Sequence, residues 1–142
     1  MRPRDRLTVE DLMTTAVISV RARDPITVAD DNMRLAEVRH LPVVDERRHV
    51  VGIVSNRDLL RVSMNPRRAT LHVADVMTHP ALTVRPQTPA ADAASLLLTH
   101  RIGSLPVVAD DGELIGVITA TDFLEVAHRA LAGRSVGQHV EN

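Results

Sequence analysis

Cysteine is absent from this chain of 142 residues, and aromatic residues are nearly absent, because Phe123 stands alone without tyrosine or tryptophan. The lack of cysteine excludes disulfides, thiolate nucleophiles and thiolate metal sites. The lack of aromatic residues excludes a row of stacking rings for single-stranded nucleic acid and an aromatic cage. Any ring-shaped ligand must therefore lie between aliphatic side chains.

The chain also lacks an excess of either charge, because 17 lysine and arginine residues face 18 aspartate and glutamate residues. This balance argues against nucleic acid or an anionic membrane as a bulk partner. No apolar run approaches the roughly 20 residues that a membrane span needs, and Met1–Thr8 is rich in Arg and Asp with no apolar segment behind it. Apolar residues, 44% of the total, are enough for a buried core, so we expect a globular, cytoplasmic protein.

What the chain does have is an internal repeat. Residues 9–60 align without a gap on residues 73–124, with 15 identical positions. Self-similarity at a fixed separation predicts two copies of one supersecondary unit. The identical positions include Asp11/Asp75, Met13/Met77, Thr14/Thr78, Val20/Val84, Pro25/Pro89, the runs 41–44 and 105–108, Gly52/Gly116 and Asp58/Asp122.

Both copies show the same order of predicted elements. A short apolar stretch precedes a capping residue and a proline, which mark a helix start, and the helix carries apolar residues at spacings of three and four. Two apolar runs rich in Val and Ile then predict buried strands in a hairpin, followed by a last helix. In the first copy we expect a strand at 17–20, a helix start at Asp24-Pro25, an inner helix face of Ile26, Ala29, Met33 and Ala36, strands at 41–44 and 50–54, and a last helix that begins at Ser55 and turns Leu59-Leu60 inward. In the second copy we expect a strand at 82–84, a helix start at Thr88-Pro89, an inner helix face of Ala90, Ala93 and Leu97, strands at 105–108 and 114–118, and a last helix that begins at Thr119 and turns Phe123-Leu124 inward.

A unit of about 60 residues buries only about 60% of its unfolded surface and is marginal alone. We therefore expect both repeats, each strand-helix-strand-strand-helix, to pack into one α/β body. Repeat 1 spans residues 9–64 and repeat 2 spans residues 72–131, with a polar linker at 65–71. The tail at 132–142 has few apolar residues and no period, and we expect it to be flexible.

The most informative element occurs twice, as Gly52–Asp58 and Gly116–Asp122. In both, a glycine enters a buried strand, Ser55 or Thr119 stands where the strand meets the helix, and an aspartate follows three residues later. One interpretation is purely structural, because this spacing forms a capping box at a helix start. The other is functional, since helix N–H groups and the hydroxyl suit a phosphate, and the aspartate suits the vicinal hydroxyls of a ribose. Phosphate and ribose together indicate a nucleotide.

The duplicated motifs resemble a known family. The motifs occur twice over about residues 9–126, in the order Asp-Val/Leu-Met-Thr, Pro, Leu-Pro-Val-Val, and then Gly, two apolar residues and Ser/Thr-x-x-Asp. This pattern is similar to a tandem pair of CBS (cystathionine-β-synthase type) domains, or Bateman module. The resemblance implies an α/β fold with pseudo-two-fold symmetry and two clefts between the repeats, which in many members bind AMP, ADP, ATP or a related adenosyl ligand. It also implies a homodimer built through helices, and a regulatory role in which nucleotide occupancy is passed to a partner protein.

The resemblance further implies which residues line each cleft. Each cleft combines the Ser/Thr-x-x-Asp element of one repeat with the methionine, the adenine-lining first-strand residue and the two residues before Leu-Pro of the other repeat. We expect the clefts to differ in positive charge, because Arg39-His40 corresponds to Gly103-Ser104, although Arg39 and His40 also fit a solvated helix end. Carried over, the Thr119 cleft would contain Thr119, Thr121, Asp122, Met13, Ile18, Arg39 and His40, and the Ser55 cleft would contain Ser55, Arg57, Asp58, Met77, Leu82, Gly103 and Ser104.

Two other functions stay open. A ligand-free scaffold would use both Ser/Thr-x-x-Asp elements as helix caps only. An enzyme handling phosphoryl groups would need an acidic metal cluster, whereas Asp30-Asp31 and Asp110-Asp111 fit a helix face and a turn. The histidines are not spaced as metal ligands and no nucleophile or phosphate-loop signature occurs, so we expect no metal, no cofactor and no catalysis. Arg67-Arg68 without a recognition helix does not predict nucleic-acid binding.

Overall fold

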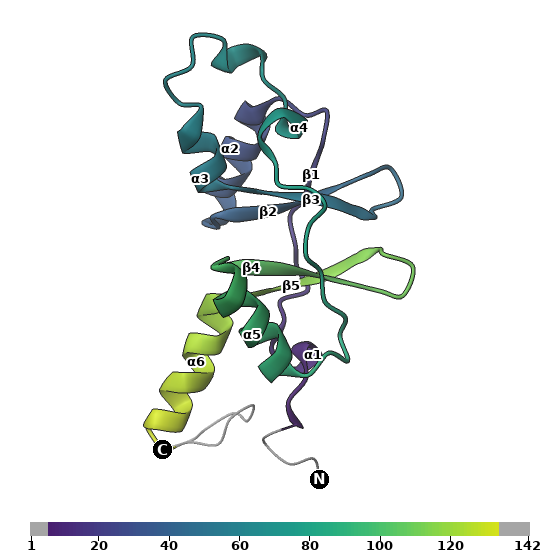
Figure 1. Cartoon of the computed structure of the whole chain (residues 1–142), viewed down its shortest axis with the longest axis vertical. Coiled ribbons are helices and arrows are strands. Elements are labelled where there is room, and N and C mark those ends of the chain that lie inside the picture. The colour runs from purple at the N-terminus through teal and green to yellow at the C-terminus, as the bar shows by residue number, and fades with distance from the viewer. Residues whose placement is uncertain (1–5, 134–142) are drawn as a thin grey trace.

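The computed structural model describes residues 6–133 and has a mixed α/β architecture in which the order of elements repeats (Figure 1). This confirms the predicted fold class. The first repeat contains α1 (Val9–Leu12), β1 (Val20–Arg21), α2 (Ile26–Ala36), β2 (His40–Val44), β3 (Val50–Ser55) and α3 (Asn56–Arg61), and the rest of the chain contains η2 (Arg68–Thr70), α4 (Val73–Val76), α5 (Ala90–His100), β4 (Ser104–Val108), β5 (Leu114–Thr119) and α6 (Ala120–Leu131).

Two small sheets lie in the middle of the molecule, with α2 and α3 beyond one sheet and α5 and α6 beyond the other (Figure 1). In the first sheet, β1 runs parallel to β2, and β2 pairs antiparallel with β3. In the second, β4 pairs antiparallel with β5, and Val84 forms a single parallel bridge to Val107. The parallel pairing of Val20 with Val43 is the counterpart of that bridge, so the sheets repeat each other as the sequence does.

The first helix of each repeat packs into the core of the other repeat. Val9 of α1 belongs to the cluster formed around Leu105 and Ile118, whereas Val73 of α4 belongs to the cluster that contains Ile26. The backbone N–H groups of Val9 and Val73 donate to carbonyl groups of the other repeat at 2.9 and 2.8 Å. Each core is therefore built from residues of both repeats, in agreement with the expectation that they form one body.

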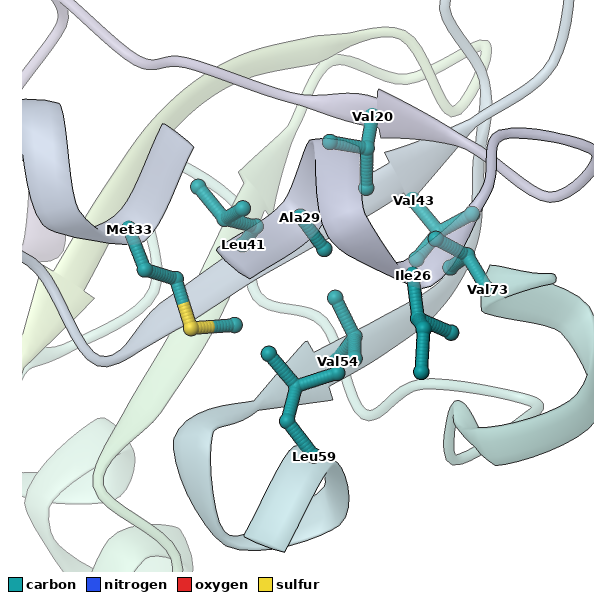
Figure 2. Close-up of a cluster of buried hydrophobic side chains, with 9 residues drawn as sticks. All are labelled: Val20, Ile26, Ala29, Met33, Leu41, Val43, Val54, Leu59 and Val73. Carbon is teal, nitrogen blue, oxygen red and sulfur yellow. The ribbon is translucent and has the colours of Figure 1, made fainter. Parts of the chain in front are cut away.

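The first core lies between the helices and the first sheet, and its side chains point toward one another from six elements (Figure 2). They are Val20, Ile26, Ala29, Met33, Leu41, Val43, Val54, Leu59 and Val73. The predicted inner faces of the two long helices are buried as expected, except that Ala36 is only half-buried. Leu41–Val44 and the run 105–108 are buried along their whole length, as continuous apolar strands predict.

The predicted first strands are too long. Of residues 17–20 only Val20 pairs in a strand, and of residues 82–84 only Val84 forms a bridge. The reason is that both segments cross from one sheet to the other. Thr14 pairs with Val117 in the second sheet before the chain reaches the first sheet at Val20, so the residues between cannot follow either strand.

The predicted starts of the long helices are one residue early. Pro25 and Pro89 are the N-caps of α2 and α5 and not their first helical residues, and neither makes a side-chain capping bond. Asp24 and Thr88 instead accept hydrogen bonds from backbone N–H groups three residues earlier, at 2.8 and 3.0 Å. The first N–H group of each helix donates to a backbone carbonyl of the segment that enters α4 or α1, so these helix starts are satisfied by the packing of the repeats.

The last helices turn only one of each predicted pair inward. Leu59 is buried and Phe123 packs partly against the second core, whereas Leu60 is 63% exposed and Leu124 is 69% exposed. Consecutive helical residues lie about 100° apart, so both members of a pair cannot face one core. Most of the predicted tail, residues 134–142, lies outside the described residues. Within residues 6–133 the helices are too short or too polar to cross a lipid bilayer.

Candidate functional site

Both Ser/Thr-x-x-Asp elements form capping boxes at a strand-to-helix junction. The N–H group of Ser55 donates to Asp58 Oδ2 at 2.8 Å, and the Asp58 N–H group donates back to Ser55 Oγ at 3.1 Å. The N–H and hydroxyl groups of Thr119 donate to Asp122 Oδ2 at 2.8 and 3.3 Å, and the Asp122 N–H group donates to Thr119 Oγ1 at 3.4 Å. The structural interpretation of these motifs is thus correct, and it leaves the carboxylates oriented at the start of α3 and α6.

The two carboxylates differ in what surrounds their second oxygen. Asp58 is buried, and its Oδ1 lies 3.5 Å from a guanidinium nitrogen of Arg61. Asp122 is half-buried, and none of the described residues bonds to its Oδ1. Burial raises the pKa of Asp122, and the hydrogen bonds from Thr119 oppose this rise. Asp122 therefore keeps an acceptor oxygen that an incoming hydroxyl group can use.

Each predicted methionine packs against the strand that leads to the Ser/Thr-x-x-Asp element of the other repeat. A Cβ atom added to Gly116 would meet Met13 Sδ at 2.9 Å, and one added to Gly52 would meet Met77 Sδ at 2.9 Å. Backbone bridges, including the one between Thr14 and Val117, fix the same approach. The structure therefore brings Met13 to the strand before Thr119, and Met77 to the strand before Ser55.

Ile18 and Leu82, the residues expected to line an adenine ring, are both exposed. They lie on the segments that cross between the two sheets, and 45% of Ile18 and 40% of Leu82 is accessible to solvent. Exposed apolar side chains are common singly, but these two occupy equivalent positions of the repeats. Each segment that crosses between the sheets therefore carries an aliphatic side chain that is open to solvent. In a chain without stacking aromatic residues, such a side chain can contact a ring-shaped ligand.

The residues before Leu-Pro lie beside the helix start of their own repeat. The carbonyl of Arg39 accepts from the Asn56 N–H group at 2.8 Å, and His40 pairs with Ser55 across the hairpin. In the second repeat, the carbonyl of Gly103 accepts a hydrogen bond from the first helical N–H group of α6 at 2.9 Å. Among the described residues, no hydrogen bond or ion pair joins Arg39 or His40 to the Thr119 element.

His40 does reach the other repeat by packing. A Cβ atom added to Gly103 would lie 2.7 Å from His40 Cε1 and 3.0 Å from its Nε2, so the imidazole occupies the space that a side chain would need there. Burial lowers the pKa of His40, the charge of Asp58 opposes this shift, and the charge of Arg39 adds to it. His40 thus contacts Gly103, a residue expected in the Ser55 cleft, although His40 itself was expected in the Thr119 cleft.

Ser104 carries a feature that the sequence did not reveal. Its side chain is buried, and its hydroxyl oxygen has no hydrogen-bond partner within residues 6–133. Buried polar groups normally have a partner, so this hydroxyl is an exception within the described residues. Arg57 and Thr121, the middle positions of the two Ser/Thr-x-x-Asp elements, are both exposed to solvent.

A separate cavity of about 630 Å³ lies between the turn after β1 and the β2–β3 hairpin. Of the predicted site residues only Met77 lines it, and no sequence motif pointed to it. Across the described part of the chain, no group of three or more His, Asp or Glu side chains is placed to hold a metal ion.

Comparison with known proteins gives the context of these features. A sequence model described as CBS domain matches residues 9–65 and 73–129. A CBS domain-containing protein from Dictyostelium discoideum is 27% identical over 137 residues, covering 89% of this chain and 94% of that protein. An inosine-5'-monophosphate dehydrogenase from Korarchaeum cryptofilum is 35% identical over 120 residues, covering 84% of this chain but only 24% of the enzyme.

Solved structures show the same arrangement. The crystal structure of CBSX2, a CBS-pair protein from Arabidopsis thaliana, in complex with AMP is similar with a TM-score of 0.78 and 35% identity. The similarity covers 87% of this chain and 98% of that one. The matched repeats, the duplicated motifs and the shared fold establish that the chain belongs to the CBS domain family and carries two CBS domains in tandem.

Proposed function

We propose that the chain is a regulatory module that binds an adenosine nucleotide in clefts between its two CBS domains and performs no catalysis. The observation that carries the proposal is the half-buried carboxylate of Asp122. It is held at a helix start by Thr119 and has an oxygen with no partner among the described residues. Such a carboxylate can accept hydrogen bonds from the vicinal hydroxyls of a ribose.

Other groups assigned to the proposed Thr119 cleft suit the rest of a nucleotide. At the start of α6, a helix of 12 residues, the N–H groups of Ala120 and Asp122 already have partners, so the N–H group of Thr121 and the helix dipole are what favour a phosphate. Ile18 offers an exposed aliphatic surface to the adenine ring. CBSX2, which is 35% identical to this chain, crystallised with AMP, and this supports an adenosine ligand here.

The proposal assigns the two clefts as the family motifs imply. The Thr119 cleft takes Thr119, Thr121 and Asp122 together with Met13, Ile18, Arg39 and His40, and the Ser55 cleft takes Ser55, Arg57 and Asp58 together with Met77, Leu82, Gly103 and Ser104. The packing of each methionine on the opposite glycine strand supports this pairing. The Thr119 cleft binds the more anionic ligand, because its set includes Arg39 at the position that Gly103 takes in the Ser55 cleft.

We further propose that occupancy is passed on through a homodimer to a partner protein. Exposed leucine side chains stand on all four helices outside the sheets: Leu35, Leu60, Leu98, Leu124 and Leu131. A second copy of the chain that covers these leucines would bury apolar surface that is otherwise in water. In the inosine-5'-monophosphate dehydrogenase relative, the matching region is about a quarter of a larger enzyme, which is consistent with a regulatory role for this unit.

The competing function is a scaffold without a ligand. Both Ser/Thr-x-x-Asp elements are complete as helix caps, and Asp58 already has Arg61 beside it, so the motif needs no ligand to explain it. Thermal unfolding with AMP, ADP, ATP, S-adenosylmethionine and NAD separates the two functions, with product analysis to detect turnover. Binding raises the melting temperature, whereas a scaffold shows no shift even at millimolar ligand, where a site with a millimolar Kd is half filled.

A further inference from the structure

The cavity beside the β2–β3 hairpin has the volume of a small-molecule site and a partly apolar lining. Its volume of about 630 Å³ lies within the roughly 300–1,000 Å³ usual for ligand pockets. Its apolar lining comes from Ala22, Val44, Val51 and Met77, of which Val44 is buried and the other three are half-buried. The pocket is open to solvent, so an apolar part of a ligand would pack against this lining on one side.

The acidic side chains at the rim, Asp45 and Glu46, already have partners within the protein. Asp45 Oδ1 accepts hydrogen bonds from the backbone N–H groups of Arg47 and His49, both at 2.9 Å, and its Oδ2 lies 3.9 Å from His49 Nδ1. These bonds, that from His49 first, lower the pKa of Asp45, so this carboxylate stays ionised within the turn. Glu46 lies 3.8 Å from a guanidinium nitrogen of Arg23.

Two cations at the same rim have no such partner. Arg21 and Arg47 line the cavity, and within residues 6–133 neither guanidinium forms an ion pair or a hydrogen bond. The charge of Arg47 helps to lower the pKa of Asp45, but the Asp45 oxygens accept from backbone N–H groups, so among the described residues the guanidinium donors of Arg21 and Arg47 stay free. Two guanidinium groups beside an apolar lining favour an anion that carries an apolar body. We propose that this cavity is a second binding site, which takes a small organic anion with a phosphate or carboxylate group.

The second repeat provides an internal comparison. Arg85 occupies the position of Arg21, but it forms an ion pair with Asp110 on the neighbouring hairpin. The positions of Arg47 and His49 are taken by Asp111 and Glu113. The basic rim is therefore a property of the first repeat alone and is not required by the fold.

The site is distinct from the proposed nucleotide clefts. None of the residues from the two Ser/Thr-x-x-Asp elements lines the cavity. Met77 is the one shared residue, because it lines the cavity and also packs on Gly52 of β3. Binding at this site does not depend on the proposed nucleotide function.

The test uses phenyl phosphate, which joins a phosphate to an apolar ring, and inorganic phosphate as the comparison. In ¹H–¹⁵N spectra of the whole chain, phenyl phosphate should shift the signals of residues 21–23 and 45–49 and bind more tightly than inorganic phosphate. The double variant Arg21→Gln/Arg47→Gln should weaken binding roughly tenfold or more, because two charge-assisted contacts are lost. The matched control Arg85→Gln should bind like the parent protein.

AMP titrations of the same variants separate this proposal from the nucleotide function. The double variant should keep the parent affinity for AMP, and Asp122→Ala should keep the response to phenyl phosphate. The proposal is overturned if phenyl phosphate shifts only residues 55–58 and 119–122, or if the double variant binds it as tightly as the parent. Failure of AMP binding alone leaves the cavity site standing.

Discussion

The imidazole ring of His40 lies where a side chain of Gly103 would stand, so these two residues interlock across the boundary between the CBS domains. A Cβ atom at position 103 would come within 2.7 Å of His40 Cε1. The backbone of Gly103 has no positive φ angle, so the space and not the conformation requires glycine. The side chain missing from one repeat is matched by the side chain present in the other.

Gly103→Ala should therefore lower the free energy of unfolding by about 1 kcal/mol, the lower end of the cost of overpacking. Urea unfolding measures the change. In a His40→Ala background the same substitution should cost nothing or stabilise slightly, since alanine restricts the unfolded chain more than glycine does. Equal losses in both backgrounds would show that the two residues are not coupled.

Stability should fall as the solution is acidified from pH 7 through the titration of His40. Burial lowers the pKa of this imidazole in the folded protein below its ordinary value of 6.5. The folded state then binds fewer protons than the unfolded state between the two pKa values, so stability rises with pH across that window and is lost below it. His40→Gln should flatten the pH dependence just below pH 6.5, measured by urea unfolding; an unchanged slope would contradict the assignment.

Arg39→Ala should weaken AMP more than adenosine, because only AMP carries the phosphate that Arg39 is proposed to meet. The loss for AMP should be about 1.5 to 3 kcal/mol, the range of hydrogen bonds to charged groups. Calorimetry with both ligands gives the comparison, and Arg57→Ala, on the other cleft, is the matched control. Parent-like AMP affinity in Arg39→Ala would remove Arg39 from the Thr119 cleft.

Asp122→Ala should weaken AMP and adenosine alike, since the ribose is common to both. It should also destabilise the fold by about 1 kcal/mol through the lost capping box. Asp122→Asn keeps an acceptor for the cap and separates folding from binding. Asp58→Ala should leave the Thr119 cleft intact, so loss of the high-affinity site in that variant would mean that the stronger cleft is the other one.

Leu124→Glu should shift the protein toward a monomer in sedimentation experiments at tens of micromolar, because a charge on α6 would have to be buried in the proposed dimer. Gln87→Glu, an exposed substitution in the turn that precedes α5, should have no effect. A parent protein that is already monomeric under these conditions would exclude the proposed dimer.

The repeat and its core were predictable, because identical residues at a fixed separation carry the same burial in both copies. Val20 and Val84 or Gly52 and Gly116 are examples of this correspondence. The crossing of residues 14–20 between sheets was not predictable, since an apolar segment shows no sign of which sheet it pairs with. Strand length was therefore overestimated there.

The candidate site was only partly visible in the sequence. The Ser/Thr-x-x-Asp spacing predicted the capping boxes because they are local, with all their bonds within four residues. The contact of His40 with Gly103 and the buried hydroxyl of Ser104 depend on how two distant segments pack. The cavity near Arg21 and Arg47 likewise joins residues from separate turns. The number of charged residues in the sequence does not show which arginine has an acidic neighbour in the fold.

The placement of α1 and α4 in each other's cores has a consequence for how such a chain is divided. In topology it is a domain-swapped dimer whose two subunits have been fused end to end. A cut within the linker at residues 65–71 would not release two independent folding units, because each fragment would carry away a helix that belongs to its neighbour's core. The halves would instead have to recombine by fragment complementation, so the unit of folding is the pair.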